Sequence, residues 1–81
     1  MYKVYILQDD LGKLYKGITN NLTRRVKEHM SGSTPSTKRM VGIKVVFQEE
    51  FATRKDARRR EVYLKSAAGR RFIKKLNIIR P

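Results

Sequence analysis

Runs of hydrophobic residues divide the chain into segments that predict three β-strands. Residues 2–8, 13–18 and 43–51 are rich in valine, isoleucine and aromatic residues, which are typical of strands. Between the first two, Asp9 and Gly12 supply turn chemistry, because Gly12 can adopt a positive φ angle. We therefore expect a hairpin. The third segment is a nearly continuous apolar run, which favours a strand covered on both faces in the middle of the sheet.

A helix is predicted directly after the hairpin, because hydrophobic residues recur there at four-residue spacing. Either Asn20 or Asn21 can cap its first turn. Leu22, Val26 and Met30 form the stripe that we expect to face the core. This helix would then cover one face of the sheet.

A polar loop rich in glycine, serine and proline follows at residues 31–37 and continues into Lys38 and Arg39. It has two interpretations of equal weight. It is either a plain connector or a flap that contacts phosphate groups.

A second helix is expected from Thr53, which caps it, to about Ala68. The buried stripe of this helix is apolar except for one carboxylate, Glu61. A glutamate is almost never buried without a partner, so this position requires an explanation. Glu61 either forms an ion pair with Arg25 or a nearby lysine, or it binds a metal ion.

The last helix is predicted over residues 70–76, because Gly69 breaks or bends the chain before it. The complete pattern predicts an α/β domain of the α+β type. It would be a three-stranded, mostly antiparallel sheet flanked by helices, in the order β-β-α-β-α-α. Eighty-one residues are near the lower end of the range for independent folding, so we treat residues 1–81 as one domain.

The net charge of the chain indicates what kind of partner it binds. The chain has 20 lysines and arginines against seven acidic residues, a net charge of +13. This excess is far beyond what solubility requires, and it favours nucleic acid over a merely soluble basic protein or an anionic lipid surface. Charge alone does not distinguish DNA from RNA.

The chain contains no cysteine, which excludes disulfides and thiol chemistry. No apolar run approaches the roughly 20 residues of a membrane span, and the N-terminus lacks the layout of a signal peptide. We therefore expect a soluble cytoplasmic protein that does not act on membranes.

Four side chains with useful chemistry occur on the hairpin and the first helix: Tyr5, Tyr15, Arg25 and His29. Arg25 and His29 are four residues apart, so they share one helix face. Arginine suits a phosphate group and histidine can move a proton near neutral pH. A tyrosine has an ordinary pKa of about 10, so it needs a nearby cation or metal to act as a base. Each residue alone is more often structural, so these residues together with Glu61 in a basic chain predict, by themselves, only a protein that binds nucleic acid.

The same residues carry a resemblance to a known family. The segments KVY at 3–5 and YKG at 15–17, followed by the arginine and histidine of the helix, resemble the motifs of the GIY-YIG nucleases. Nearly the whole chain is similar to small stand-alone bacterial members and to the nuclease domain of the excision-repair excinuclease C subunit. Lys3 and Lys16 depart from the family motif, which has glycine and isoleucine there.

The resemblance implies a metal-dependent endonuclease that hydrolyses DNA phosphodiester bonds with an activated water. Tyr5 or Tyr15 would orient or deprotonate that water. Arg25 would clamp the scissile phosphate, and His29 would assist proton transfer. Glu61 would hold one Mg²⁺ or Mn²⁺, because the metal-binding glutamate of the family is on this helix.

Further expectations concern a residue that supports the site, the residues that contact nucleic acid, and the selectivity for a DNA sequence. Asn77 matches loosely an asparagine that supports the family's site. Contacts to DNA, or to RNA, are expected from basic side chains near the site: Lys16, Lys38, Arg39, Arg58 and Arg59. The sequence has no additional DNA-reading motif, so we expect low sequence selectivity unless a homodimer or a partner protein provides targeting.

Two alternatives keep the same fold and charge. One is a non-catalytic nucleic-acid-binding module, and the other is a small ribosome-associated or RNA-binding protein. The enzyme requires Glu61 to face the tyrosines across an open polar cleft. A binding module would tolerate Glu61 paired with an arginine.

Overall fold

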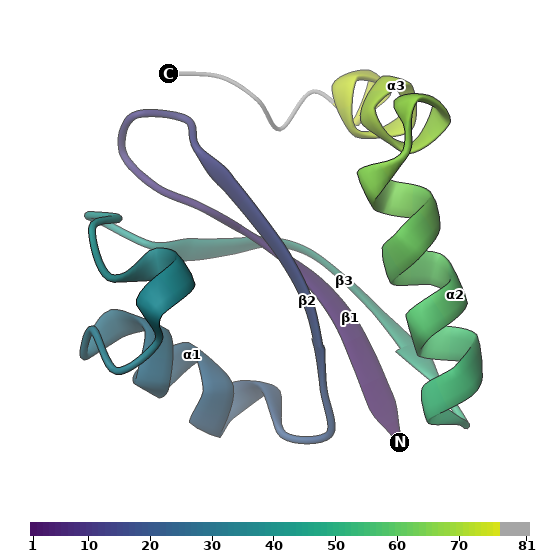
Figure 1. Cartoon of the computed structure of the whole chain (residues 1–81), viewed down its shortest axis with the longest axis horizontal. Coiled ribbons are helices and arrows are strands. Elements are labelled where there is room, and N and C mark those ends of the chain that lie inside the picture. Colours follow the sequence, from purple (N-terminus) through teal and green to yellow (C-terminus); the bar gives the residue numbers. More distant parts are fainter. Residues whose placement is uncertain (77–81) are drawn as a thin grey trace.

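The computed structural model describes residues 1–76 as a three-stranded sheet with helices on both faces. Its elements are β1 (Tyr2–Gln8), β2 (Leu14–Thr19), α1 (Leu22–Met30), the 3₁₀-helix η1 (Pro35–Thr37), β3 (Lys44–Phe51), α2 (Arg54–Lys65) and α3 (Ala67–Lys75). Helix α1 lies on one side of the sheet and helices α2 and α3 lie on the other (Figure 1). The predicted class and element order are confirmed, and each strand boundary agrees within one residue.

The hairpin forms as expected because its turn is built from local hydrogen bonds. The Asp9 carboxylate accepts hydrogen bonds from the backbone N–H groups of Leu11 at 3.0 Å and Lys13 at 2.7 Å. Gly12 has a φ angle of +87°, which glycine adopts without strain. β1 and β2 therefore pair antiparallel, with Tyr5 opposite Gly17.

The predicted position of the third strand is wrong. The strand order is β2-β1-β3, so β1 is in the middle and β3 is at an edge. All side chains from Val4 to Gln8 are buried, whereas Val45, Val46 and Phe47 are only half-buried. The strands β1 and β3 both contain continuous apolar runs, and such a run does not reveal which strand has two neighbours.

The helix caps are confirmed, but the break between the last two helices is not where we expected it. Asn21 caps α1, and Thr53 caps α2. Helix α2 ends at Lys65, and Ser66 caps the start of α3 by accepting a hydrogen bond from the backbone N–H of Gly69 at 3.1 Å. Gly69 is inside α3, where a Cβ atom would collide with the backbone at the end of α2. The glycine allows close packing of two helices instead of ending one.

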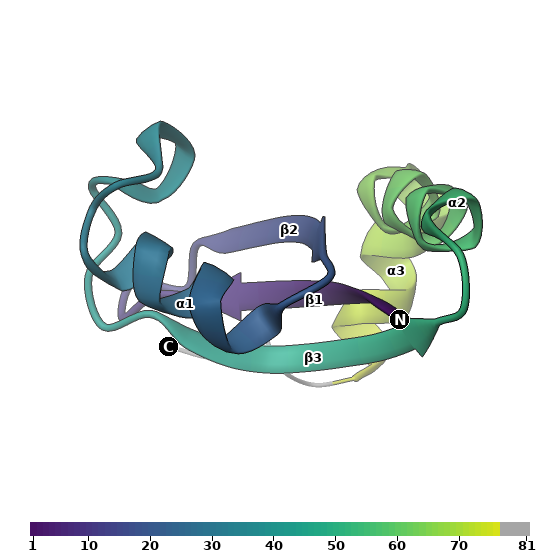
Figure 2. The ribbon, with the colours of Figure 1, turned by 90° about the horizontal axis from the view of Figure 1, so that it is seen from below.

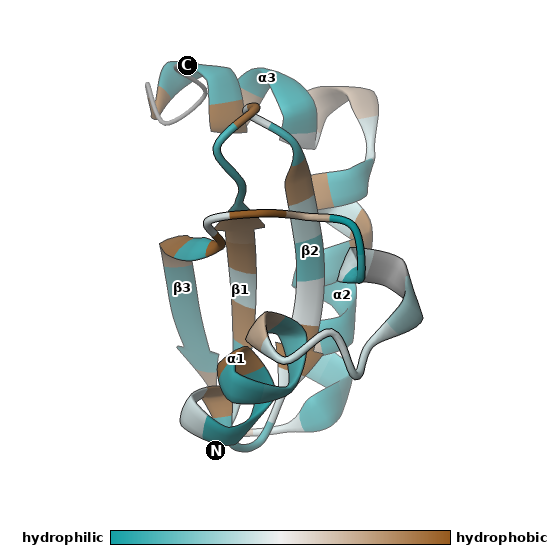
Figure 3. Cartoon of the chain, turned by 90° about the vertical axis from the view of Figure 1, so that its left-hand side faces the viewer, coloured by the Kyte–Doolittle hydropathy of each residue, from teal (hydrophilic) through white to brown (hydrophobic). Residues whose placement is uncertain are grey.

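One core lies between the sheet and helices α2 and α3. Val4 and Ile6 from β1 pack there against Ala57 and Leu64 of α2 and Ile73 of α3. Side chains alternate between the two faces of a strand, so the intervening residues of β1 point to the other side. Hydrophobic residues mark much of β1, while most residues of α2 are hydrophilic (Figure 3).

A second core lies on the α1 face of the sheet. Tyr5 and Leu7 pack there with Ile43, and Leu22 and Val26 of α1 cover them. Figure 2 shows α1 and η1 together on one side, away from α2 and α3.

The expected stripe of α1 is only partly correct. Met30 is 63% exposed, because α1 ends at this residue and Ser31 already caps it. His29 is buried in its place, with 1% exposure.

None of the helices within residues 1–76 is sufficiently long and apolar to span a lipid bilayer.

Candidate active site

The hairpin brings the two tyrosines together on the α1 face of the sheet. The ring centroids of Tyr5 and Tyr15 are 6.2 Å apart. Gly17 lies beside both rings, and a Cβ atom there would be 2.7 Å from the Tyr5 hydroxyl and 3.1 Å from the ring of Tyr15. The glycine of the YKG segment is therefore what allows the two rings to approach each other.

Helix α1 adds the arginine and the histidine to this pair. The Tyr5 hydroxyl is 2.9 Å from Nε2 of His29, and the Tyr15 ring centroid is 4.8 Å from that of His29. The Arg25 guanidinium lies beside both tyrosine hydroxyls and donates a hydrogen bond to Glu28 at 2.9 Å. The structure thus gathers all four side chains that the sequence singled out on the hairpin and first helix.

The two tyrosines are not equivalent. Tyr5 has no exposed surface, and burial raises its pKa to about 12, although the adjacent Arg25 partly opposes this. Tyr5 is therefore a neutral hydroxyl at physiological pH. Tyr15 is half-buried and lines a pocket of about 640 Å³ together with Lys38 and Arg39. Of the two, Tyr15 is the one that a substrate can reach.

Sequence reasoning missed Thr37, which fixes the histidine from the other side. The Thr37 hydroxyl is 2.7 Å from Nδ1 of His29, and Thr37 is 1% exposed. A neutral imidazole has one donor and one acceptor nitrogen, so these two contacts use both. Thr37 belongs to η1 in the polar loop, where no periodic pattern marks it. The loop is therefore tied to the site, while the phosphate-contacting role remains a prediction.

His29 is held in its neutral form. Burial is the main cause that lowers its pKa, and the charge of Arg25 adds to the effect. The neutral imidazole can accept a proton.

This lowered pKa predicts a dependence of stability on pH. The unfolded state takes up a proton near the ordinary pKa of about 6.5, before the folded state does, so acid favours unfolding. The wild type should keep its full stability above pH 7 and become less stable as the pH falls below the ordinary pKa of about 6.5, by at most about 1.4 kcal/mol per pH unit. Chemical denaturation at several pH values measures this.

The control for this prediction is His29→Gln, since His29 is the one histidine of the chain. The variant should be less stable at pH 7.5 but nearly independent of pH between 5 and 7.5. Equal slopes for the two proteins would show that His29 does not titrate in this way.

A second prediction concerns Gly17. Gly17→Ala places a methyl group within 3 Å of the Tyr5 hydroxyl, and the buried ring has little freedom to move. Overpacking of this kind costs about 1–3 kcal/mol of unfolding free energy. Urea denaturation of Gly17→Ala, of Tyr5→Phe and of the double variant gives the coupling. Removing the hydroxyl should recover part of the loss, and purely additive effects would contradict the proposed contact.

The expectation that Glu61 faces the tyrosines across an open polar cleft is not confirmed, because Glu61 lies apart from the four-residue cluster. It is on α2, on the sheet face that carries Val4 and Ile6, and its side chain is only 9% exposed. Its carboxylate pairs with Arg58 at 3.5 Å and Lys65 at 3.3 Å. The alternative partner considered from the sequence, Arg25, pairs instead with Glu28 on its own helix.

The surroundings of Glu61 are compatible with a magnesium ion of sparse protein coordination. Within residues 1–76, no three histidine or acidic side chains gather into a metal cluster. A cation at Glu61 would have one carboxylate ligand, and Mg²⁺ commonly completes such a site with waters and substrate phosphate oxygens. The side chains of Arg58 and Lys65 are 67% and 56% exposed, so both are able to move aside.

The remaining predicted residues fall into separate groups. Lys38 and Arg39 line the Tyr15 pocket, and Lys16 points to the opposite face of β2. Arg58 is engaged by Glu61, and Arg59 is exposed on α2. Asn77 lies outside the described residues.

Comparison with known proteins agrees with this fold and motif. Residues 1–77 match the family described as the GIY-YIG catalytic domain. The chain therefore belongs to the GIY-YIG family, which is a family of nucleases.

Several proteins that are similar to this chain are small bacterial proteins. A UPF0213 protein of Clostridium perfringens is 41% identical over 66 residues, which cover 80% of this chain and 71% of that protein. A UPF0213 protein of Bacillus licheniformis is 36% identical over 62 residues, 75% of this chain and 64% of that protein. The solution NMR structure of a UPF0213 protein from Bacillus halodurans has a TM-score of 0.56 and 31% identity, covering 94% of this chain and 85% of that one.

Proposed function

We propose that this protein is a metal-dependent endonuclease that hydrolyses phosphodiester bonds of DNA. The observation that carries the proposal is the cluster of Tyr5, Tyr15, Arg25 and His29, which reaches a basic pocket through Tyr15. The family supports nucleic acid as the substrate. The net charge of +13 favours a polyanion in the same way.

Arg25 would bind the scissile phosphate. Its contact with Glu28 is the main reason that its pKa is raised, so the guanidinium stays charged. It is one-third exposed, which leaves part of its planar fork available to a phosphate. A positive group held in place before the reaction stabilises the charge that develops in the transition state.

The remaining three side chains would handle the proton of the attacking water. The Tyr15 hydroxyl, which adjoins that of Tyr5, would orient the water and accept its proton while passing its own to Tyr5. Tyr5 would pass a proton to Nε2 of His29, whose other nitrogen donates to Thr37. Such a relay does not require Tyr5 to become a free phenolate, which its raised pKa disfavours.

Glu61 would hold the divalent cation. When bound, Mg²⁺ or Mn²⁺ supplies charge stabilisation for the phosphate and the leaving oxygen. Lys65 pairs with Glu61, and its charge also lowers the pKa of Lys16 on β2, so a substrate that contacts the edge of this strand is compatible with a cation at Glu61.

A second candidate is a non-catalytic nucleic-acid-binding module. The observation in its favour is that Glu61 is already paired with Arg58 and Lys65 and lies across the sheet from the tyrosines. A module of this kind needs the basic surface but no metal.

Both candidates predict binding of nucleic acid, but only the endonuclease predicts cleavage of it. End-labelled DNA and RNA oligonucleotides, linear and branched, are incubated with the purified protein and Mg²⁺ or Mn²⁺. The endonuclease should convert DNA to shorter products with phosphate and hydroxyl ends. Tight binding with no product in either metal would support the binding module and contradict the enzyme.

A further inference from the structure

A pocket of about 370 Å³ lies between β2 and α3, on the sheet face opposite the tyrosines. Four of its lining residues are cationic: Lys16, Arg70, Arg71 and Lys74. No acidic side chain lines it, and none of the four forms an ion pair within residues 1–76. The sequence marked only Lys16 among them as a contact for nucleic acid.

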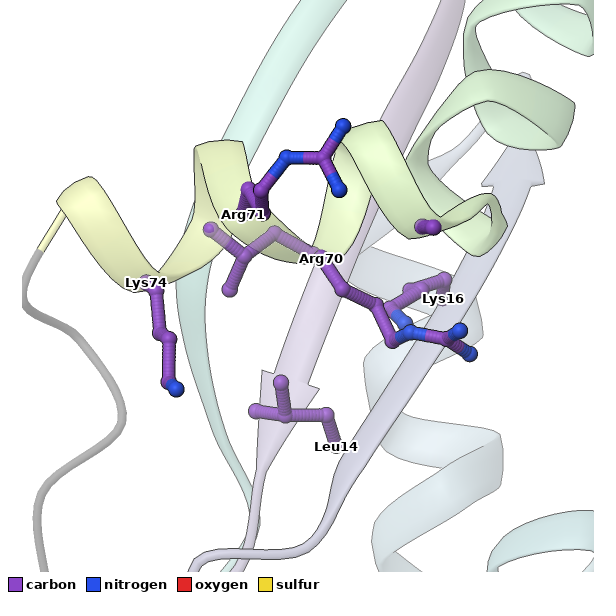
Figure 4. A pocket seen from close by; sticks show the side chains of 7 residues that line it. Leu14, Lys16, Arg70, Arg71 and Lys74 are labelled. Atoms are coloured by element: carbon purple, nitrogen blue, oxygen red, sulfur yellow. The ribbon is translucent and has the colours of Figure 1, made fainter.

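The four cations come from two elements, and the side chains of Arg71 and Lys74 extend in other directions than that of Arg70 (Figure 4). Lys16 projects from β2, and the other three project from α3, with Arg70 extending toward Lys16 (Figure 4). Apolar side chains, including Leu14 and Ile73, form the rest of the wall. An apolar wall excludes water, which strengthens the attraction between these cations and an anion.

The charge of Lys16 is disfavoured in the free protein. Burial is the main cause that lowers the pKa of Lys16, and the neighbouring charges of Arg70 and Lys65 lower it further. Like charges held close together repel one another, and here no carboxylate of the pocket compensates them. An anionic ligand would relieve this repulsion.

The pocket adjoins the Tyr15 pocket at the edge of the sheet. Leu14 lines both of them, and β2 has a neighbouring strand on one side only. Tyr15 and Lys16 follow it on the strand and point to opposite faces. A chain of phosphates that contacts Tyr15, Lys38 and Arg39 can therefore continue across the β2 edge to Lys16.

We propose that the pocket between β2 and α3 is a second phosphate-binding site, which holds the backbone of the nucleic acid beside the bond to be cleaved. This rests on the proposed function only in taking nucleic acid as the ligand. The site reads no bases, because lysine and arginine contacts to phosphates carry no sequence information. It would fix the position of the strand on the protein.

The test compares two double variants with the same change in net charge. Arg70→Gln/Lys74→Gln removes two cations from the pocket, whereas Lys55→Gln/Lys75→Gln removes two exposed cations outside it. Binding of a fluorescent DNA duplex is measured by anisotropy at several salt concentrations without divalent metal. The pocket variant should bind more weakly, and its slope of log affinity against log salt should fall by about two. The control should stay close to the wild type.

Lys16→Met adds a readout that a merely structural role would not produce. Removing this charge should raise the melting temperature of the free protein and weaken DNA binding. Equal losses in the two double variants would show attraction by net charge alone and overturn the site. Unchanged DNA binding by Lys16→Met would overturn it as well, as would pyrophosphate saturating the pocket without competing with DNA.

These outcomes are separate from the question of catalysis. A wild type that binds DNA through the pocket without cleaving it would keep this site and contradict the endonuclease. If the wild type cleaves DNA and the pocket variants bind DNA as well as the wild type does, the endonuclease is supported and this phosphate site is contradicted.

Discussion

Glu61→Gln is expected to reduce metal-dependent cleavage by at least about 100-fold, since a bound metal contributes several kcal/mol to the transition state. The substitution keeps size and hydrogen bonding but removes the charge that holds a cation. DNA binding should persist or tighten, because a negative charge beside the phosphates is lost. Initial cleavage rates in saturating Mg²⁺ and binding by anisotropy measure the two effects.

Stability gives the second half of this test. If Glu61 were only an ion-pair partner, Glu61→Gln would lower stability and leave cleavage unchanged. The partner side chains of Arg58 and Lys65 are more than half exposed, so they can reach solvent and the loss should stay small. The cleavage rate is therefore the deciding quantity. Glu50→Gln, at an exposed position of β3, is the matched control and should behave like the wild type.

Arg25→Lys is expected to lower cleavage by about 100-fold while changing DNA affinity little. Arg25 pairs with Glu28 and lies beside both tyrosine hydroxyls, and an ammonium group cannot reproduce its planar fork. Losing one fixed charge-stabilising donor costs about 10²–10³ in rate in well-studied enzymes.

Arg24→Lys is the control for this substitution. Arg24 is the preceding residue, pairs more loosely with the same Glu28 at 3.8 Å, and its side chain is 63% exposed. Its replacement should leave the single-turnover rate unchanged. Similar losses in both variants would mean that Arg25 acts through general charge and not through its position.

The sequence predicted those parts of the molecule that local interactions determine. Asp9 and Gly12 define their turn through hydrogen bonds within five residues, so the hairpin was foreseeable. The caps at Asn21 and Thr53 are equally local. Strand order is not local, because it depends on which apolar run is covered by both neighbours, and β3 was placed wrongly for this reason.

In the candidate site, too, the features set by local spacing could be predicted and those set by tertiary packing could not. The spacing of Arg25 and His29 placed them on one helix face, and the structure brings this face to the tyrosines. Thr37 could not be found, because its role depends on how the polar loop folds back over α1. The position of Glu61 across the sheet depends on helix packing, which periodicity along α2 does not contain.

The most direct measurement of the central claim is the nicking of a supercoiled plasmid by the purified protein. Mg²⁺ is added first, then chelator, and finally Mn²⁺ in excess of the chelator. The Arg25→Lys variant is purified in the same way, so that a contaminating nuclease would be detected in both proteins. We predict nicking that starts with Mg²⁺, stops with chelator, resumes with Mn²⁺ and is at least about 100-fold slower in the variant. Bound but intact plasmid in every metal, or equal nicking by both proteins, would contradict the assignment as a metal-dependent endonuclease.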